Sequence, residues 1–322
     1  MPRFVAPCQS AHTLMKRGGG GMLPLIQDVD SAAPHGDSLA PQSLKTGVSS
    51  NFSPASCDSA CCFAGSRDES SSRASLLLSR VLVCIPTYNE VRNIKELLEQ
   101  ILALYEELQI LVIDDNSTDG TREILHAMVR EHERVHILER AGKLGLGSAY
   151  IAAFMWGLDR GFMYFIQMDA DFSHHPRYLK QTLQNLSCFD VVINSRNILG
   201  GGVRGWGLFR RLLSGFGSLY ARLCLGVRIM DFTGGFNAYS KSVLCGIGLS
   251  DIGSNGYCFQ IEMKYRAFRT GARIIELPIV FDDRVEGASK MSRSIIFEAL
   301  WRTPALRYVL RHSRHQSSVH KA

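Results

Sequence analysis

The chain has 322 residues, of which 46% are hydrophobic and 20% charged, and its formal net charge is +6. This composition is that of a globular protein with one large domain or two small ones. The mild basic excess suits an anionic ligand or an anionic membrane surface. It does not favour nucleic acid as a partner, because no dense run of Lys and Arg interleaved with aromatic residues is present.

Cysteine spacing and hydropathy exclude several further classes of protein. The nine cysteines fit neither a zinc site nor a disulfide framework, which favours reduced thiols in a cytoplasmic protein. No apolar run reaches the roughly 18 residues that a membrane-spanning helix needs. The first 26 residues also lack the continuous apolar core of a signal peptide. We therefore expect no transmembrane helix.

The first part of the chain differs in composition from the rest. Residues 1–79 are rich in Ser, Gly, Pro and Ala and show no hydrophobic period. This pattern predicts a disordered or targeting extension outside the fold. Residues 80–322 are predicted to form a single folded domain.

The folded part begins with apolar runs that alternate with helical patterns. Runs at 81–85, 109–113, 135–138, 165–168 and 190–194 predict buried strands. Helical spacing is seen at 93–105 and 118–131, and again from Gly147 to about Leu158. Strands that alternate with helices predict an α/β fold with a mostly parallel open sheet and helices on both faces.

The second half has a different pattern. It contains a helical period at 256–268 and a strand at 273–280, which Pro278 marks as an edge strand. A helical segment at 292–310 contains Pro304, which should break or kink it. Residues 208–225 and 295–310 mix apolar and aromatic residues with Arg, so they could lie in a membrane interface. The alternative, that both are ordinary amphipathic helices packed on the sheet, stays open.

Asp169 and Asp171 directly follow a predicted strand. Their spacing can aim two carboxylates at one divalent cation, although Asp is also common at the start of a turn. The carboxyl ends of parallel strands meet at one edge of an open sheet. That edge should also hold Glu90 and Asp115. A cation would relieve the repulsion among the four carboxylates, which favours a metal site.

Three other motifs are less informative. Gly145-Leu146-Gly147 lacks the spacing of a dinucleotide-binding loop, so its glycines are expected to allow close backbone approach. The stretch from Ser117 to Thr121 predicts a turn in which Ser117 or Thr118 caps the next helix. His174 and His175 run into Pro176, which favours the start of a helix over a metal site.

Arginines and a lysine occur in glycine-containing loops of the second half. They are Arg196, Arg210, Arg211, Arg284 and Lys290. Each could be a solvated surface charge. A phosphate-binding enzyme, however, needs such cations, since Arg pairs with phosphate in a fork geometry and Lys acts as a point charge.

From Val81 to Trp301 the chain resembles the polyprenol-phosphate (dolichol-phosphate) mannosyltransferases, which have the inverting GT-A glycosyltransferase fold. The resemblance is carried by six stretches in order. They are Ile85–Glu90, Ile113–Thr121, Lys143–Tyr150, Met168–Pro176, Asp231–Phe236 and Asp283–Ser292.

The resemblance implies three groups of site residues. Those implied for the nucleotide sugar are Pro86, Tyr88, Glu90, Ile113, Asp115, Asp169, Ala170, Asp171, Arg196, Arg284 and Lys290. Those implied for Mg²⁺ or Mn²⁺ are Asp169, Asp171 and Ser173, although some relatives have Gln in place of Ser173. Arg210 and Ser214 are implied for the acceptor phosphate, and Asp171 and Arg210 for catalysis.

The chain departs from the family pattern on the acceptor side. Gly207 stands where some relatives carry Asp, Phe209 where they carry Lys, and Gly235 where others carry Ser. The lipid acceptor is therefore less firmly implied than the donor. The amphipathic elements from about residue 198 onward would supply the acceptor and membrane-interface part of the domain.

The resemblance implies inverting transfer of mannose from GDP-mannose to a polyprenyl or dolichyl monophosphate. It also implies a peripheral protein on the cytoplasmic face of a membrane, with a small membrane-anchoring subunit as a further partner. Two alternatives stay open. One is the same reaction with UDP-glucose or another sugar nucleotide, and the other is a non-catalytic subunit that binds a sugar nucleotide or a lipid.

Overall fold

The computed structural model describes residues 78–282 and 300–310, which all lie in one compact unit. The extension predicted at the start of the chain therefore lies almost wholly outside the described residues. Arg284 and Lys290 also lie outside them. The backbone of Arg210 is described as helical, but its side chain is not.

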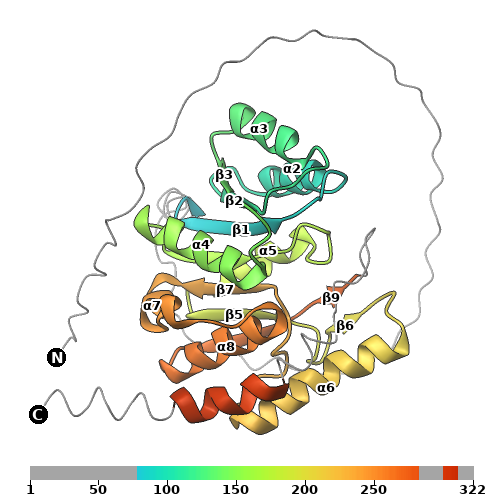
Figure 1. Ribbon diagram of the computed structural model, residues 1–322, viewed down its shortest axis with the longest axis vertical. Helices are drawn as coiled ribbons and strands as arrows, with labels where there is room; N and C mark the ends of the chain where they lie inside the picture. The colour runs from blue at the N-terminus through green and yellow to red at the C-terminus, as the bar shows by residue number, and fades with distance from the viewer. Residues whose placement is uncertain (1–77, 283–299, 311–322) are drawn as a thin grey trace, which may run out of the picture. The chain divides into compact units, whose positions relative to one another are not determined.

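A seven-stranded sheet with strand order β3-β2-β1-β4-β7-β5-β8 forms the centre of the fold (Figure 1). Its strands are β1 (Val81–Thr87), β2 (Gln109–Asp114), β3 (Val135–Glu139), β4 (Tyr164–Gln167), β5 (Val191–Ser195), β7 (Asn237–Ser240) and β8 (Ile274–Pro278). Strand β7 runs antiparallel to both of its neighbours, and the other pairs are parallel. The predicted mostly parallel sheet is confirmed.

Helices cover both faces of the sheet, as predicted. One face carries α2 (Ile94–Leu104), α3 (Thr121–Glu131) and α5 (Leu179–Asn185), and the other carries α4 (Leu146–Asp159), α7 (Lys241–Gly246) and α8 (Gly256–Arg269). Each face has its own apolar core, since successive residues of a strand point to opposite faces. Leu82 and Cys84 of β1 face α4, whereas Val83 and Ile85 face α2.

Several short elements complete the described fold. They are the 3₁₀ turns η1 (Pro176–Tyr178) and η2 (Leu249–Asp251) and a two-stranded parallel sheet of β6 (Gly202–Val203) and β9 (Val280–Phe281). Strand β8 ends at Pro278 on the edge of the large sheet, as its proline predicts. Pro176 begins η1, and the His175 ring accepts a hydrogen bond from the Arg177 N–H. The predicted helix start at this point is confirmed.

The prediction that Ser117 or Thr118 caps α3 is wrong. Asp119 accepts the hydrogen bond from the Thr121 N–H instead, at 3.1 Å. The Ser117 hydroxyl donates to Asp114 at 2.5 Å, and its oxygen accepts the Asn89 N–H at 2.9 Å. Ser117 therefore joins the loops after β1 and β2 and is not available to cap the helix.

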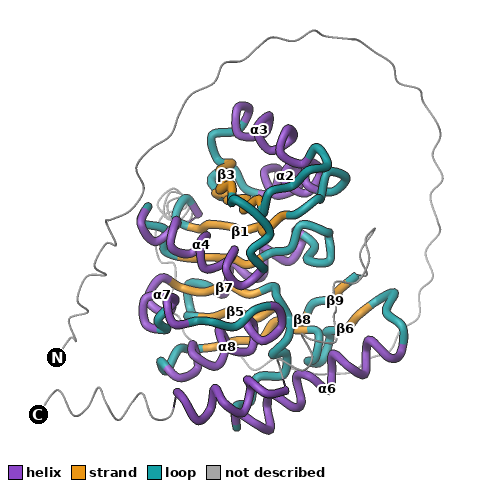
Figure 2. Tube along the Cα trace, viewed as in Figure 1, coloured by secondary structure: helices purple, strands orange, loops and turns teal. Residues whose placement is uncertain are grey.

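Helix α6 (Leu208–Leu225) and the helical segment at 300–310 lie side by side (Figures 1 and 2). The predicted break at Pro304 does not occur, since residues 300–310 are continuously helical, and the alternative, a kink, stays a prediction. Pro304 has no N–H for the carbonyl of Leu300, and the Tyr220 hydroxyl of α6 donates to that carbonyl at 2.7 Å instead. Among the described residues, no helix is long and apolar enough to cross a membrane.

Candidate active site

The site is built where parallel strands end. Strand β1 pairs in parallel with β2 on one side and with β4 on the other, so their carboxyl ends meet at one edge. Strand β5 also runs in this direction, because it is separated from β4 only by the antiparallel β7. This edge therefore collects Asp115, Asp169 and Arg196, each directly or closely following its strand.

The residues predicted for the nucleotide lie at the ends of β1 and β2. Pro86 and Ile113 are register partners in the two strands. The Tyr88 ring follows β1 and lies 4.1 Å from the Lys143 ammonium, which comes from the glycine-containing loop before α4. The half-buried Glu90 accepts a hydrogen bond from the Asn93 amide at 3.1 Å.

Asp115 is buried, and its contacts connect the end of β2 with the loop that precedes α4. Its Oδ2 accepts the Leu144 N–H at 3.2 Å, and its Oδ1 lies 3.1 Å from Nη1 of Arg140. This ion pair lacks hydrogen-bond geometry, so Oδ1 keeps acceptor capacity. Burial raises the pKa of Asp115, although Arg140 and the Leu144 N–H offset part of that effect.

Gly145 and Gly147, at the start of α4, serve close packing, as predicted. A Cβ on Gly147 would lie 2.8 Å from the Ser254 carbonyl oxygen, and Gly145 has a φ of +98°. Only glycine fits at either position without strain. The close approach brings α4 against α8 and places Tyr150 of α4 near the end of β4.

Asp169 is oriented by two residues whose role the sequence did not suggest. The Tyr150 hydroxyl donates to Oδ1 of Asp169 at 3.3 Å. The backbone N–H of Asp169 donates to Nδ1 of His174 at 2.9 Å. His174 is buried and stacks on Phe236 with ring centroids 5.0 Å apart. Burial, with a smaller effect of the Asp169 charge, raises the pKa of Tyr150 well above its ordinary value. The hydroxyl therefore remains a donor.

Asp171 is held by the turn that follows it. Its Oδ1 accepts hydrogen bonds from the N–H and the hydroxyl of Ser173, at 3.2 and 2.5 Å. Phe172 between them has a φ of +60°, a strained conformation for a bulky residue that costs about 1–3 kcal/mol. Ser173, predicted as a metal ligand, thus positions Asp171 here, and its role as a ligand stays a prediction.

The two carboxylates fit a divalent cation that is shared with a substrate. The Asp169 side chain is 29% exposed, so it is open to a ligand, whereas Asp171 is buried. Within residues 78–282 and 300–310, no cluster of three or more His, Cys, Asp or Glu side chains could hold a metal. Mg²⁺ commonly takes one or two carboxylates together with phosphate oxygens and water, and this donor set suits it.

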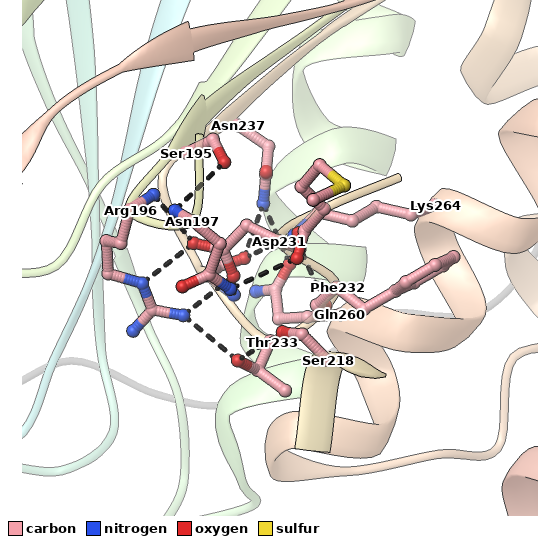
Figure 3. Close-up of polar contacts among 12 residues, drawn as sticks. Ser195, Arg196, Asn197, Ser218, Asp231, Phe232, Thr233, Asn237, Gln260 and Lys264 are labelled. Carbon is pink, nitrogen blue, oxygen red and sulfur yellow. Dashed lines mark hydrogen bonds and ion pairs between the residues drawn. The ribbon is translucent and has the colours of Figure 1, made fainter. Parts of the chain in front are cut away.

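Arg196 lies at the end of β5 in a buried polar network (Figure 3). Its Nε and Nη2 donate to the two oxygens of Asp231 at 2.8 and 2.7 Å, and Nη2 also donates to Thr233 at 2.9 Å. Burial lowers the pKa of Arg196, but Asp231 outweighs this effect and Asp169 adds to it. Two of the three guanidinium nitrogens are thus engaged, and the predicted contact with phosphate would fall to Nη1.

The acceptor-side residues are only partly described. Ser214 is half-buried on α6. Further along the same helix, Ser218 is buried and its hydroxyl lies 3.3 Å from that of Thr233. Helix α6 is therefore in direct contact with the network around Arg196.

Most of these residues could be assigned to one site from the sequence, but three supporting residues could not. Tyr150, His174 and Asp231 all lie within stretches that carry the family resemblance, and this was the available signal. Their individual roles depend on contacts with distant parts of the chain, which spacing does not reveal.

Comparisons with known proteins show which family the chain belongs to. Residues 82–247 match the model of "Glycosyl transferase family 2". The chain is 44% identical over 221 residues to an undecaprenyl-phosphate mannosyltransferase of Micrococcus luteus, covering 69% of this chain and 91% of that protein. It is 43% identical over 225 residues to a polyprenol monophosphomannose synthase of Mycolicibacterium smegmatis, covering 69% and 85% respectively.

Solved structures support the fold. Glucosyl-3-phosphoglycerate synthase from Mycobacterium tuberculosis, in complex with Mn²⁺, UDP-glucose and phosphoglyceric acid, superposes with a TM-score of 0.52 at 18% identity. The match covers 72% of this chain and 84% of that one. Since the family model matches more than half of the chain, including every strand of the large sheet except β8, and since a relative at 44% identity is covered over 91% of its length, the chain belongs to glycosyl transferase family 2.

Proposed function

We propose that this protein transfers mannose from GDP-mannose to a polyprenyl or dolichyl monophosphate, giving a β-mannosyl phosphate lipid. The observation that carries this proposal is the strand-end site, where Asp169 lies near enough to the buried guanidinium of Arg196 for its charge to raise the pKa of Arg196, and where Asp171 follows two residues later. It is supported by 44% identity over 91% of an undecaprenyl-phosphate mannosyltransferase.

The nucleotide would lie across the ends of β1 and β2. The Tyr88 ring and the half-buried Pro86 would offer apolar contact for the base and ribose, whereas the side chain of Ile113, the register partner of Pro86, is fully buried in the core. Asp115 would take a hydrogen bond from an N–H of the base through the 9% of its side chain that is exposed. A sugar nucleotide thus matches both the apolar and the polar character of this half of the site.

Asp169 and Asp171 would hold Mg²⁺ or Mn²⁺ against the diphosphate of the donor. When bound, the cation neutralises the diphosphate and makes it a better leaving group. Tyr150 and Ser173 fix the two carboxylates, so little reorganisation is needed when the donor enters. Arg284 and Lys290 are proposed to contact the same diphosphate.

The acceptor needs no dedicated general base, because a lipid monophosphate is already an anion at neutral pH. One of its oxygens would bond to the anomeric carbon as the bond from that carbon to the diphosphate breaks and GDP leaves. A single displacement of this kind inverts the anomeric centre. Arg210 and Ser214 of α6 are proposed to position the acceptor phosphate. The resemblance implies Arg196 for the nucleotide sugar, but we propose that Arg196 meets the acceptor phosphate instead, because Thr233 and Ser218 connect it to α6.

A transfer assay tests the proposal. Purified protein is incubated with Mg²⁺ or Mn²⁺, a polyprenyl phosphate and labelled GDP-mannose or UDP-glucose, and the lipid fraction is counted. We expect labelled lipid from GDP-mannose. Label from UDP-glucose alone would overturn the choice of mannose. No transfer from either donor, with vesicles containing candidate membrane partners also tested, would refute the enzymatic function.

An exposed apolar face suggests where the lipid reaches the protein. On α6, Leu212, Phe216, Leu219 and Leu223 are exposed at a spacing that places them on one side of the helix. Trp301, Tyr308 and Val309 are exposed on the helix beside it, and Trp301 is 79% exposed. We propose that this face rests on a bilayer surface.

Replacing both Leu212 and Leu223 by glutamate is expected to weaken vesicle binding by about tenfold or more, since each loses apolar area from the interface. Both side chains are more than half exposed, so the fold should not change. Co-sedimentation with anionic vesicles measures the effect. The matched control is Leu104→Glu, an exposed leucine at the end of α2 on the opposite part of the fold (Figure 1). Equal loss in both proteins would contradict the assignment of this face.

A further inference from the structure

Lys264 of α8 is a completely buried lysine with an unusual set of partners. Its Nζ donates to the carbonyl oxygens of Asp231 at 2.8 Å, Phe232 at 3.2 Å and Gly234 at 2.7 Å (Figure 3). An ammonium group carries three protons, so all of them are used on one loop. Lysine is almost never fully buried unless it is paired, and here backbone oxygens form the pair.

This loop, residues 231–235, enters β7 at the strand-end site. On one side it is held by Lys264. On the other, Asp231 and Thr233 accept hydrogen bonds from Arg196. A Cβ on Gly235 would lie 3.3 Å from the His174 ring and 3.9 Å from Oδ1 of Asp169. The loop thus lies between a buried ammonium and two residues proposed to handle the donor and the acceptor.

The charges around the loop are balanced. Glu276 of β8 accepts the N–H groups of Met230 and Asp231 at 2.7 and 2.9 Å. Two carboxylates, Asp231 and Glu276, therefore face two cations, Arg196 and Lys264. Removal of the lysine ammonium would leave the loop carbonyls without their donors and the site with an excess of negative charge.

We propose that Lys264 is a positioning residue for the transfer reaction: it fixes the 231–235 loop so that Arg196 meets the acceptor phosphate and Gly235 stays clear of Asp169. This inference rests on the proposed function. Lys264 itself touches neither substrate, and it acts through the loop. A shift of about 1 Å in such a positioning element can cost roughly 10²-fold in rate.

The ionisation of Lys264 provides an independent readout. Burial lowers the pKa of Lys264 to about 8, and the charges of Asp231 and Glu276 offset part of that effect, whereas Arg196 adds to it. A neutral amine has only two protons for three carbonyls. The loop should therefore lose one hydrogen bond as the pH rises through about 8, and the acceptor step should slow.

Lys264→Met tests the proposal, with Lys180→Met, an exposed lysine on α5, as the matched control. Folding is checked by circular dichroism and thermal unfolding. For the folded variant we expect kcat/KM for polyprenyl phosphate to fall about 100-fold while GDP affinity in Mg²⁺ stays within about threefold. Unchanged kcat/KM, or an equal loss of acceptor and donor binding, would overturn the proposal.

The unmodified protein gives a second test if Lys264→Met does not fold. Its kcat/KM for the acceptor should fall above pH about 8, while its affinity for GDP in Mg²⁺ stays constant over the same range. A flat acceptor profile would overturn the proposal. Absence of transfer by the unmodified protein at any pH would refute the proposed function instead, so the two failures are distinguishable.

Discussion

Replacing Asp171 by asparagine is expected to reduce turnover by about 10³-fold while leaving the fold intact. Asp171 is buried, and its Oδ1 accepts two hydrogen bonds from Ser173. The asparagine amide has nearly the same shape and still offers an oxygen to both donors. It lacks the negative charge that a divalent cation on the donor diphosphate would require.

Three measurements distinguish this loss of charge from a loss of structure. Turnover of the variant is compared with its thermal unfolding and with its affinity for GDP in the presence and absence of Mn²⁺. The matched control is Asp159→Asn, an exposed carboxylate at the end of α4. We expect metal-dependent GDP binding to weaken only in the Asp171 variant. Near-normal turnover in that variant would mean that the carboxylate pair does not hold a metal.

Much of the fold could be predicted because its strands are continuous apolar runs. The run from Val81 to Ile85 is fully buried, and such a run predicts a central strand with little ambiguity. Strand β7, in contrast, has only four residues, Asn237–Ser240, and two of them are polar. Its place in the sheet depends on the strands on either side of it, which no local pattern reveals.

The candidate site divides in the same way. Asp115 and Asp169 could be placed together from the sequence, because the topology of a parallel sheet brings strand ends to one edge. The partners that orient these two carboxylates could not be predicted from the sequence. Tyr150 of α4 reaches Asp169 in the loop after β4, and Lys264 reaches a loop about 30 residues earlier in the chain. Contacts of this kind follow from tertiary packing and leave no periodic signal.

Two local predictions failed for a related physical reason. Ser117 has a side chain suited to capping, but its hydroxyl donates to Asp114 and its oxygen accepts the Asn89 N–H. Pro304 removes a backbone hydrogen bond, but Tyr220 from a neighbouring helix supplies a replacement donor. In both cases a tertiary contact outweighs the local preference.

Replacing Asp231 by asparagine is expected to lower the free energy of unfolding by about 3–5 kcal/mol, the usual cost of breaking a buried ion pair by removing one partner. Asp231 is fully buried. Its oxygens accept the N–H of Gly234 and the N–H, Nε and Nη2 of Arg196. Without the Asp231 charge, Arg196 would keep only the weaker influence of groups such as Asp169, and Lys264 that of Glu276. Urea unfolding at pH 7 measures the change.

The matched control for Asp231 is Asp190→Asn, which removes a carboxylate from the more exposed pair with Arg273. Solvent screens that pair, so we expect a much smaller loss of stability. Similar losses in the two variants would contradict the view that burial makes the Asp231 pair important. Acceptor turnover should also fall in the Asp231 variant alone, because Arg196 loses its orientation.

The contribution of Asp231 should depend on pH in a defined direction. Burial alone would raise the pKa of Asp231, but the charge and hydrogen bonds of Arg196, with Lys264, hold it well below the ordinary value of 3.8. In the unfolded chain the carboxyl becomes protonated near that ordinary value, whereas in the folded protein it stays ionised. The stability that Asp231 provides is therefore fully present above pH about 4 and is lost as the pH falls further.

The Asp231→Asn variant cannot titrate at this position, so its difference in stability from the unmodified protein isolates the effect. That difference should be constant between pH 7 and pH 5. Below the ordinary pKa of the carboxyl it should shrink by about 1.4 kcal/mol per pH unit. A difference that stayed constant down to pH 3 would mean that the carboxyl titrates alike in the folded and unfolded states, so that Arg196 and Lys264 do not stabilise its charge.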